Sequence, residues 1–532
     1  MGVSDSGLFA EFTPTERRNL AIYTLGMMAY KFALENLSGC FSNIVLQRVA
    51  INPSSTWSTI VSINFAAQSV GSLLVSPLIK RWPTARVLST TIIVFALLVA
   101  VVPIMELLTG GGRDGTLMAG EKGYKFGRWN VMIVAGLFPA IGVAHGVIEL
   151  VRRVIPSKIV GDDALKLRKM DSTVHIFYQV GGVSGALMSR YFIEWFSYAY
   201  TLTIIPVFFL FIVAPIWNRL QANDDIPAAK ARDPSKAPRG MLGELGSIFK
   251  AFFRSVWIGC KLTLTNRSLV WLTMAYAFPF VIHRYKENVL YAHYANFALG
   301  RGAFQQQLVG GSNLGELLGA CFVLFFANAV PTPLPWLRAD AITLFILWVY
   351  PTVSPPRNNI EGFVWILTAI NVPISFGWAA GDCSLVAYIQ SRLAAIEDTD
   401  PSISPLGAVM SFLYILYITL FALLSQAIGR LQDAYVADLR ARFGAPRQWP
   451  PLAGLARTQE AMFWSAGMVV TISGTLVLLS TLIPKGALQW NPDTLGDDSE
   501  LDELRQQVKG NASVVEPGEK SNNDAIKNAM FA

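Results

Sequence analysis

Charged residues are scarce in this chain of 532 residues: they make up 15%, whereas soluble domains carry about a quarter. Apolar residues make up 53% and are gathered into many runs about as long as the ~20 residues that cross a bilayer. The composition therefore predicts an all-α polytopic membrane protein whose main surroundings are lipid. We attribute the net charge of +7 to basic cytoplasmic loops, and we therefore expect no nucleic-acid partner.

Several motifs are also missing. The four cysteines are scattered without metal-site spacing, and we expect them to be small core residues and not disulfides. No phosphate-binding Gly-rich loop ends in Lys-Ser/Thr, and no Ser/His/Asp or metal-hydrolase spacing occurs. These absences argue against an ATP-driven pump and an enzyme, and we expect no cofactor and no bound metal. The first apolar run, after Arg17 and Arg18, is too long for a signal-peptide core and predicts a signal anchor.

About twelve transmembrane helices are predicted. Their approximate limits are 19–46, 56–79, 86–108, 130–152, 172–194, 198–217, 269–296, 305–329, 335–353, 362–391, 405–429 and 460–484. The sequence "TPTE", Thr13 to Glu16, is a capping box with Pro at the first helical position, so the first helix should begin there.

The longest interruption, 218–268, divides the chain into two six-helix halves, 19–217 and 269–484. It contains the amphipathic stretch "MLGELGSIFKAFFRSVWIGCKL", which predicts either a helix on the inner membrane surface or a cytosolic linker helix. We expect 1–18 to be a cytoplasmic segment and 485–532 a disordered acidic tail. The Lys and Arg bias of alternate loops places both termini in the cytoplasm. The sequence does not choose between the plasma membrane and an internal one.

The two halves share weak internal repeats. "ENLSGCFSNIVLQR" in helix 1 is matched by "ENVLYAHYANFALGR" in helix 7, with one residue inserted. "SINFAAQSVG" in helix 2 resembles "GSNLGELLG" in helix 8 and pairs Gln68 with Glu316, and "LFPAIGVAHG" in helix 4 resembles "VPISFGWAAG" in helix 10. Three matches in order, each offset by six helices, predict pseudo-symmetric halves, which is typical of secondary transporters.

Over residues 15–485 the architecture resembles the major facilitator superfamily. The inner loop "GSLLVSPLIKRWPTARVL" is similar to the family's gating loop, with Gly71, Arg81 and Arg86 at matching places, although the usual Asp and second Gly are replaced. The stretch from "VRRVIPSK" to "GGVSGAL" is a closer match to the inner loop after helix 4 and the Gly-rich helix 5. The resemblance implies a monomer in which helices 1, 4, 7 and 10 line a central cavity and the halves rock around a midplane site.

Ionisable residues lie inside these same helices, where their burial is costly unless they face a cavity or a partner. Lys31 and Glu35 share one helix face; they either line the cavity or only form a structural pair. The charged segment of helix 7, which contains Arg284 and Glu287, predicts a broken helix or an outer-interface segment. The candidate cavity residues are Lys31, Glu35, Asn36, His145, Arg284, Glu287 and Asn313.

Two carboxylates are candidate proton carriers. Glu316 has no basic neighbour at helical spacing and needs a partner on another helix, for which Lys31, Arg284 and Lys286 are candidates. Asp382 lies about 15 Å into the bilayer at 1.5 Å per residue. Burial favours the protonated form of an unpaired carboxylate. We expect Glu149 to pair with Arg153 at the inner rim.

The sequence thus predicts a secondary active transporter of a small polar organic solute, coupled to protons. A divalent-metal transporter is the alternative, because all four histidines (His145, His175, His283 and His293) lie in or beside predicted spans. A non-transporting membrane sensor or interaction protein is the second alternative; it would use the tail and the 218–268 loop.

Overall fold

The computed structural model describes residues 11–79, 81–112, 124–161, 164–220, 241–326, 329–397, 405–444 and 454–493, with 452 and 495. Within these residues the regular structure is helical, with one isolated bridge between Gly112 and Lys125. The predicted disordered tail lies largely outside the described residues.

The described helices form twelve long segments and one crosswise helix, α8 (Met241–Thr265). The first half contains α1 (Pro14–Arg48), α2 (Pro53–Ile79), α3 (Thr84–Leu108), α4 (Ile133–Val160), α5 (Ala164–Thr201) and the joined α6 (Ile204–Phe208), η1 (Phe209–Val213) and α7 (Ala214–Trp217).

Several segments of the second half are interrupted by tighter or wider turns. The seventh is α9 (Arg267–Val270), α10 (Leu272–Ala275), α11 (Ala277–Tyr285), η3 (Lys286–Leu290) and α12 (Tyr291–Phe297). Then follow α13 (Phe304–Phe326), α14 (Leu334–Thr343) with η4 (Leu344–Trp348) and α15 (Val349–Thr352), α16 (Ile360–Glu397), α17 (Pro405–Phe443), and α18 (Leu455–Met462) with η6 (Phe463–Met468) and α19 (Val469–Ser480).

Within the described residues, six helical spans are by themselves long and apolar enough to cross a membrane. The fifth and sixth segments are a further pair whose axes meet at 88°, and Ser197 leaves the helical region there with φ 68°. The remaining segments fall short of this criterion: helix α1, for example, carries Lys31 and Glu35 within its apolar length. The predicted all-α fold with many spans is confirmed, and the twelve described segments agree with the predicted number of helices.

The predicted start of the first helix is confirmed in atomic detail. Helix α1 begins at Pro14, and Thr13 is its N-cap. The Glu16 carboxylate accepts from the Thr13 backbone N–H at 2.7 Å, and the Thr13 hydroxyl accepts from the Glu16 N–H at 3.2 Å. This reciprocal pair satisfies two backbone donors that a helix N-terminus otherwise leaves unpaired.

Glycines allow close helix contacts in both halves at matching positions. A Cβ on Gly71 of α2 would overlap the Val143 carbonyl of α4, and a Cβ on Gly319 of α13 would lie 2.5 Å from the Phe376 carbonyl of α16. Small residues allow this backbone approach in membrane helices. The residue three places before each glycine is Gln68 or Glu316, as the repeat match requires.

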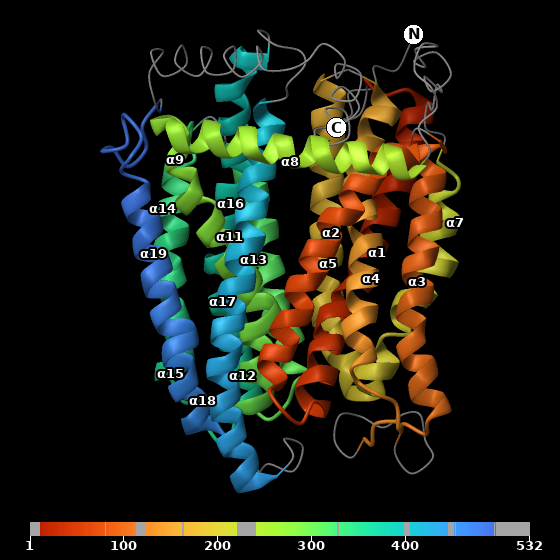
Figure 1. Cartoon of the computed structure of the whole chain (residues 1–532), viewed down its shortest axis with the longest axis vertical. Coiled ribbons are helices and arrows are strands. Elements are labelled where there is room, and N and C mark those ends of the chain that lie inside the picture. Colours follow the sequence, from red (N-terminus) through yellow and green to blue (C-terminus); the bar gives the residue numbers. More distant parts are fainter. Residues whose placement is uncertain are drawn as a thin grey trace, which may run out of the picture.

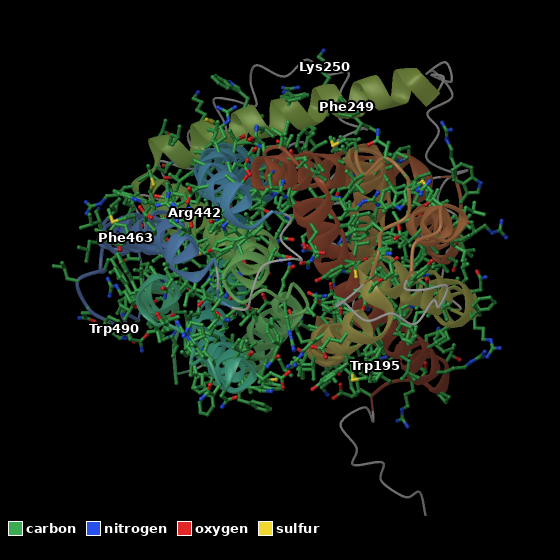
Figure 2. All side chains as sticks on the ribbon, turned by 90° about the horizontal axis from the view of Figure 1, so that it is seen from below. Trp195, Phe249, Lys250, Arg442, Phe463 and Trp490 are labelled. Carbon is green, nitrogen blue, oxygen red and sulfur yellow. The ribbon has the colours of Figure 1, made fainter. Side chains whose placement is uncertain are left out.

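Figure 1 shows the two halves side by side, the first in red to yellow and the second in green to blue. Helix α8 lies across the bundle near one end. Between the halves, α5 packs against α13 and α2 packs against α17. Seen along the bundle, α8 lies on its outer edge (Figure 2).

Candidate functional site

The inserted residue of helix 7 appears in the structure as a π-helical turn. Residues Lys286–Leu290 form η3, between α11 and α12. A π turn accommodates one extra residue without ending the helix, and such turns are frequent at functional sites. Both sequence interpretations of this segment are therefore wrong: the helix is continuous, and His283 and Lys286 are fully buried inside the protein.

The π turn meets α1 and α2 through its backbone and Asn288. The Ser38 hydroxyl donates to Asn288 Oδ1 at 2.9 Å, and the Trp57 indole N–H donates to the Asn288 carbonyl at 2.7 Å. Asn288 Nδ2 in turn donates to the Arg284 carbonyl at 2.9 Å. The seventh segment is thus held against the first half at the level of its charged residues.

Beyond this turn, toward the C-terminal end of α1, the halves are joined by amide side chains. Asn296 Nδ2 donates to Asn43 Oδ1 at 2.5 Å, and Gln47 Nε2 donates to Asn296 Oδ1 at 3.0 Å. The Ser42 hydroxyl donates to Gln305 Oε1 at 2.8 Å. Asn43 and Asn296 occupy equivalent places in the repeat, so this contact lies near the pseudo-two-fold axis that relates the two halves.

Two further contacts close the same end of the bundle on either side. The Asp433 carboxylate of α17 accepts from the backbone N–H groups of Ser54 and Ser55, at 2.7 and 3.0 Å, and so caps the start of α2. Arg190 of α5 forms an ion pair with Glu361 of α16 at 3.1 Å and also donates to Gln307 of α13. No sequence pattern pointed to any of these residues.

Away from this closed end, the Lys31–Glu35 ion pair lies on the inner face of α1. The two side chains are 17% and 9% exposed, so they border space that water reaches. The Lys31 ammonium lies 5.2 Å from the centre of the Tyr178 ring. A Cβ on Gly182 would lie 3.0 Å from Lys31 Cε and 3.3 Å from Asn313 Nδ2. The side chains of Lys31, on α1, and Asn313, on α13, therefore meet over the backbone of α5 at a position that has no side chain.

The facing groups of the second half are Arg284 and Glu287. Arg284 Nη1 lies 3.5 Å from Glu287 Oε2, and the Arg284 side chain is 43% exposed although its neighbours in the chain are buried. Glu287 Oε1 and Asn313 Nδ2 are buried atoms with no hydrogen-bond partner in the described structure. Buried polar atoms are normally satisfied, so these two are candidates for bonds to a bound molecule.

Asn36 and His145 occupy different surroundings. Asn36 is fully buried, and its amide donates to the Ala33 carbonyl of the same helix at 3.1 Å. His145 is partly exposed, with Nε2 at 3.6 Å from Glu149 Oε1. The expected Glu149–Arg153 pair is wrong: Glu149 pairs with Arg152, with both nitrogen–oxygen distances 2.7 Å.

Glu316 lies at the crossing of α13 and α5, where it accepts from Gln179 Nε2 at 3.3 Å. None of the three expected cations forms an ion pair with it among the described residues: Lys31 pairs with Glu35, Arg284 with Glu287, and Lys286 donates to Ser375. Asp382 forms neither a hydrogen bond nor an ion pair with any described residue. Both carboxylates thus lack a fixed cationic partner.

A buried polar group behind the seventh segment was missed. His283 Nε2 lies 2.9 Å from Asp340 Oδ1 of α14, and the His283 ring stacks on Trp378 with 5.1 Å between ring centres. Lys286 donates to the Ser375 hydroxyl at 2.6 Å. Asp340 lies inside a predicted span, and an ionisable residue at that depth was a signal that could have been used.

No family model matches the chain, and no curated protein matches its sequence. Among solved structures it is similar to the nucleoside transporter NupG, with 12% identity and TM-score 0.54 over 88% of this chain and 99% of that one. It is also similar to a bacterial homologue of the human lysosomal transporter Spinster in an inward-facing conformation (11%, TM-score 0.57, 88% and 97%). A D-xylose–proton symporter is a third neighbour (12%, TM-score 0.54, 90% and 98%).

The chain has the fold that these three transporters share. With its long apolar helices it is an integral multi-pass membrane protein. At identities this low, the likeness establishes the fold alone, and the function and the solute are argued from the residues.

The loop that resembles the superfamily's gating loop lies between α2 and α3. Gly71 serves close packing of α2 on α4, whereas Arg81 and Arg86 are exposed. Lys80, in the same loop, lies outside the described residues. The gating role of this loop stays a prediction.

Proposed function

We propose that the protein is a secondary active transporter that moves a small polar organic solute by alternating access. One observation supports this most: partly exposed, oppositely charged pairs from both halves, Lys31–Glu35 and Arg284–Glu287, lie beyond contacts that close one end of the bundle. Helix α8 packs on Leu73 near the end of α2, so it belongs to the opposite end. With both termini and α8 placed in the cytoplasm by the charge bias, this is an inward-open arrangement.

The mixture of charges favours a zwitterionic or anionic solute. Lys31 and Arg284 supply cations for a carboxylate or phosphate group, while Glu35 and Glu287 suit an ammonium group or a hydroxyl donor. The unpartnered Glu287 Oε1 and Asn313 Nδ2 offer one acceptor and one donor between them. The neighbours' own solutes, a nucleoside and D-xylose by their names, are polar organic molecules too.

We assign proton coupling to Glu316 and Asp382, which have no fixed cationic partner among the residues that the structure describes. In liposomes, the purified protein should accumulate a solute from a panel of polar organic compounds when a pH gradient is applied. Glu316→Gln and Asp382→Asn should each abolish this accumulation while solute exchange without a gradient continues, because the neutral side chains cannot carry a proton.

The exposed Glu460, which pairs only with the nearby Arg457 in the described structure, supplies the control Glu460→Gln. It should retain full coupling. A panel without any solute or proton flux would contradict transport, and normal coupling in both carboxylate variants would refute their assignment.

Gly182 tests where the solute lies. Gly182→Ala places a methyl group between Lys31 and Asn313, so we expect solute flux to fall about tenfold or more, because small misplacements of binding groups are costly. Thermal stability in detergent should be unchanged. Gly136→Ala is the matched control, since a Cβ there meets nothing within 4 Å. Equal flux in the two variants would remove this face of α5 from the solute site.

A divalent metal as the solute is the second candidate. Within the described residues, no three His, Cys, Asp or Glu side chains are grouped to hold a metal ion. The four histidines lie on three different segments, α4, α5 and the seventh. Metal-dependent flux that is lost in His145→Ala would nevertheless favour the metal over an organic solute.

A further inference from the structure

Helix α8 connects the two halves and is attached to both. Its first part packs Ile248 and Phe252 against Leu73 of α2. Its later part approaches α17 so closely that a Cβ on Gly259 would overlap the Ala408 carbonyl. Between these contacts α8 crosses the outside of the bundle, which is the position of an amphipathic helix at a membrane surface (Figure 2).

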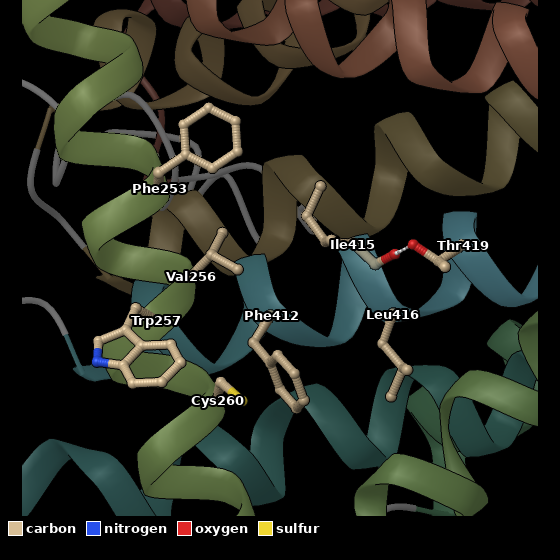
Figure 3. A pocket seen from close by; sticks show the side chains of 8 residues that line it. All are labelled: Phe253, Val256, Trp257, Cys260, Phe412, Ile415, Leu416 and Thr419. Carbon is tan, nitrogen blue, oxygen red and sulfur yellow. Dashed lines mark hydrogen bonds between the residues drawn. The ribbon is translucent and has the colours of Figure 1, made fainter.

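An apolar groove of 370 Å³ opens where α8 crosses α17 (Figure 3). Its walls include Phe253, Val256 and Trp257 from α8 and Phe412, Leu416 and Thr419 from α17. The Thr419 hydroxyl donates to the Ile415 carbonyl of its own helix at 2.9 Å. The groove therefore offers almost no free polar group, and a molecule that fills it must do so with hydrocarbon.

The groove opens to the outside of the bundle and not to another helix. Phe253 and Trp257 are 66% and 70% exposed, far more than aromatic side chains that pack inside the protein. It extends from the crosswise α8 onto the long helix α17, so it connects the level of the membrane surface with the apolar interior. A chain that enters it from the surface level can continue along α17 among lipid tails.

The charge of α8 favours an anion at the mouth of this groove. The helix carries Lys250, Arg254 and Lys261 but a single acid, Glu244. Lys250 precedes Phe253 by three residues, and Lys261 follows Trp257 by four, so both lie beside groove residues on the helix surface. Lys250 is exposed on the outer edge of the bundle (Figure 2). Basic residues at this level attract anionic lipid headgroups.

We propose that this groove binds an acyl chain of an anionic phospholipid from the adjacent leaflet, with Lys250 and Lys261 holding its headgroup. The apolar walls of the groove favour the acyl chain of the lipid, and the lysines beside the groove favour a negatively charged headgroup. The site is separate from the solute site and does not depend on the transport function.

Tryptophan quenching by brominated lipids tests the site in the full-length protein. Vesicles of phosphatidylcholine would contain, at equal mole fraction, either phosphatidylglycerol or phosphatidylcholine with brominated acyl chains. The chain has 14 Trp residues, so the difference between wild type and Trp257→Phe isolates the signal of the groove. We expect brominated phosphatidylglycerol to occupy the groove about fivefold more readily for each cation that contributes.

Three variants complete the experiment. Lys250→Gln should remove much of the preference for phosphatidylglycerol. Thr419→Phe fills the groove and should weaken quenching by both lipids, whereas Leu423→Phe, at a position on α17 that is 66% exposed and outside the groove, should change nothing. Equal quenching by the two lipids, unaffected by Thr419→Phe, would show ordinary boundary lipid and overturn the proposal. Strong quenching by a brominated free fatty acid but by neither phospholipid would overturn it as well.

Discussion

Lys31→Met is expected to abolish solute flux, and adding Glu35→Gln is expected to restore stability without restoring flux. The single change leaves the Glu35 carboxylate, whose side chain is 9% exposed, without its cation. Breaking a fully buried pair from one side costs about 3–5 kcal/mol, and water on one side of this pair lowers that cost. Removing both charges eliminates that penalty. Flux, measured with the solute found in the liposome panel, should stay lost because the solute then meets no charge on α1.

The double variant separates the two roles of the pair. If Lys31 and Glu35 only hold α1 in place, the double variant should regain flux together with its melting temperature. Arg457→Met removes an arginine that pairs with Asp438 at 2.9 Å and with Glu460. It is the matched control and should keep flux and most of the stability, since pairs at exposed positions contribute about 1 kcal/mol or less each.

Glu106→Ala should also cause a large loss of stability. This fully buried carboxylate at the end of α3 accepts from the Tyr124 hydroxyl at 2.5 Å, from the Gly127 N–H at 2.9 Å and from the Trp129 indole. Arg48 of α1 lies 3.8 Å away. Its removal takes the acceptor away from the Gly127 N–H and the Trp129 indole, although Arg48 keeps its bonds to the Gly127 and Trp129 carbonyls, so we expect the free energy of unfolding to fall by about 3–5 kcal/mol.

The measurement is the thermal midpoint in detergent, followed by size-exclusion chromatography. Glu460→Ala is the control, because Glu460 is exposed and its loss leaves no buried donor without a partner. A midpoint for Glu106→Ala that equals the control's would show that the loop after α3 does not depend on this carboxylate. Glu106→Gln should be intermediate, since the amide oxygen can still accept.

The sequence was sufficient for the fold because the bilayer constrains it strongly. Spanning segments must be long, apolar and helical, so their number and order could be predicted from apolar runs. The capping box at Thr13 is a local pattern, and it formed as predicted. The π turn at Lys286–Leu290 was harder: the repeat showed an inserted residue, but a single insertion is equally compatible with a break, and tertiary packing decides between the two.

The site was only partly predictable. The depth of a residue along its helix can be estimated from the sequence, but the residue of another helix that it contacts cannot. Lys31 and Glu35 pair as one-turn spacing indicates. The partner of Glu316 was sought among cations and is an amide, Gln179, from a helix more than a hundred residues away. The closing contact of Asp433 with the start of α2 joins residues nearly four hundred positions apart, and no spacing rule reaches that far.

The hydrogen bond between Asn43 and Asn296 joins equivalent positions of the two repeats. In a two-fold homodimer, residues near the symmetry axis contact their own copies in the partner subunit. In a dimer of two identical chains, each as long as one half, the same asparagine of both subunits would form this bond across the symmetry axis. The Asn43–Asn296 bond therefore has the geometry of an isologous contact of a two-fold dimer, made here within one polypeptide.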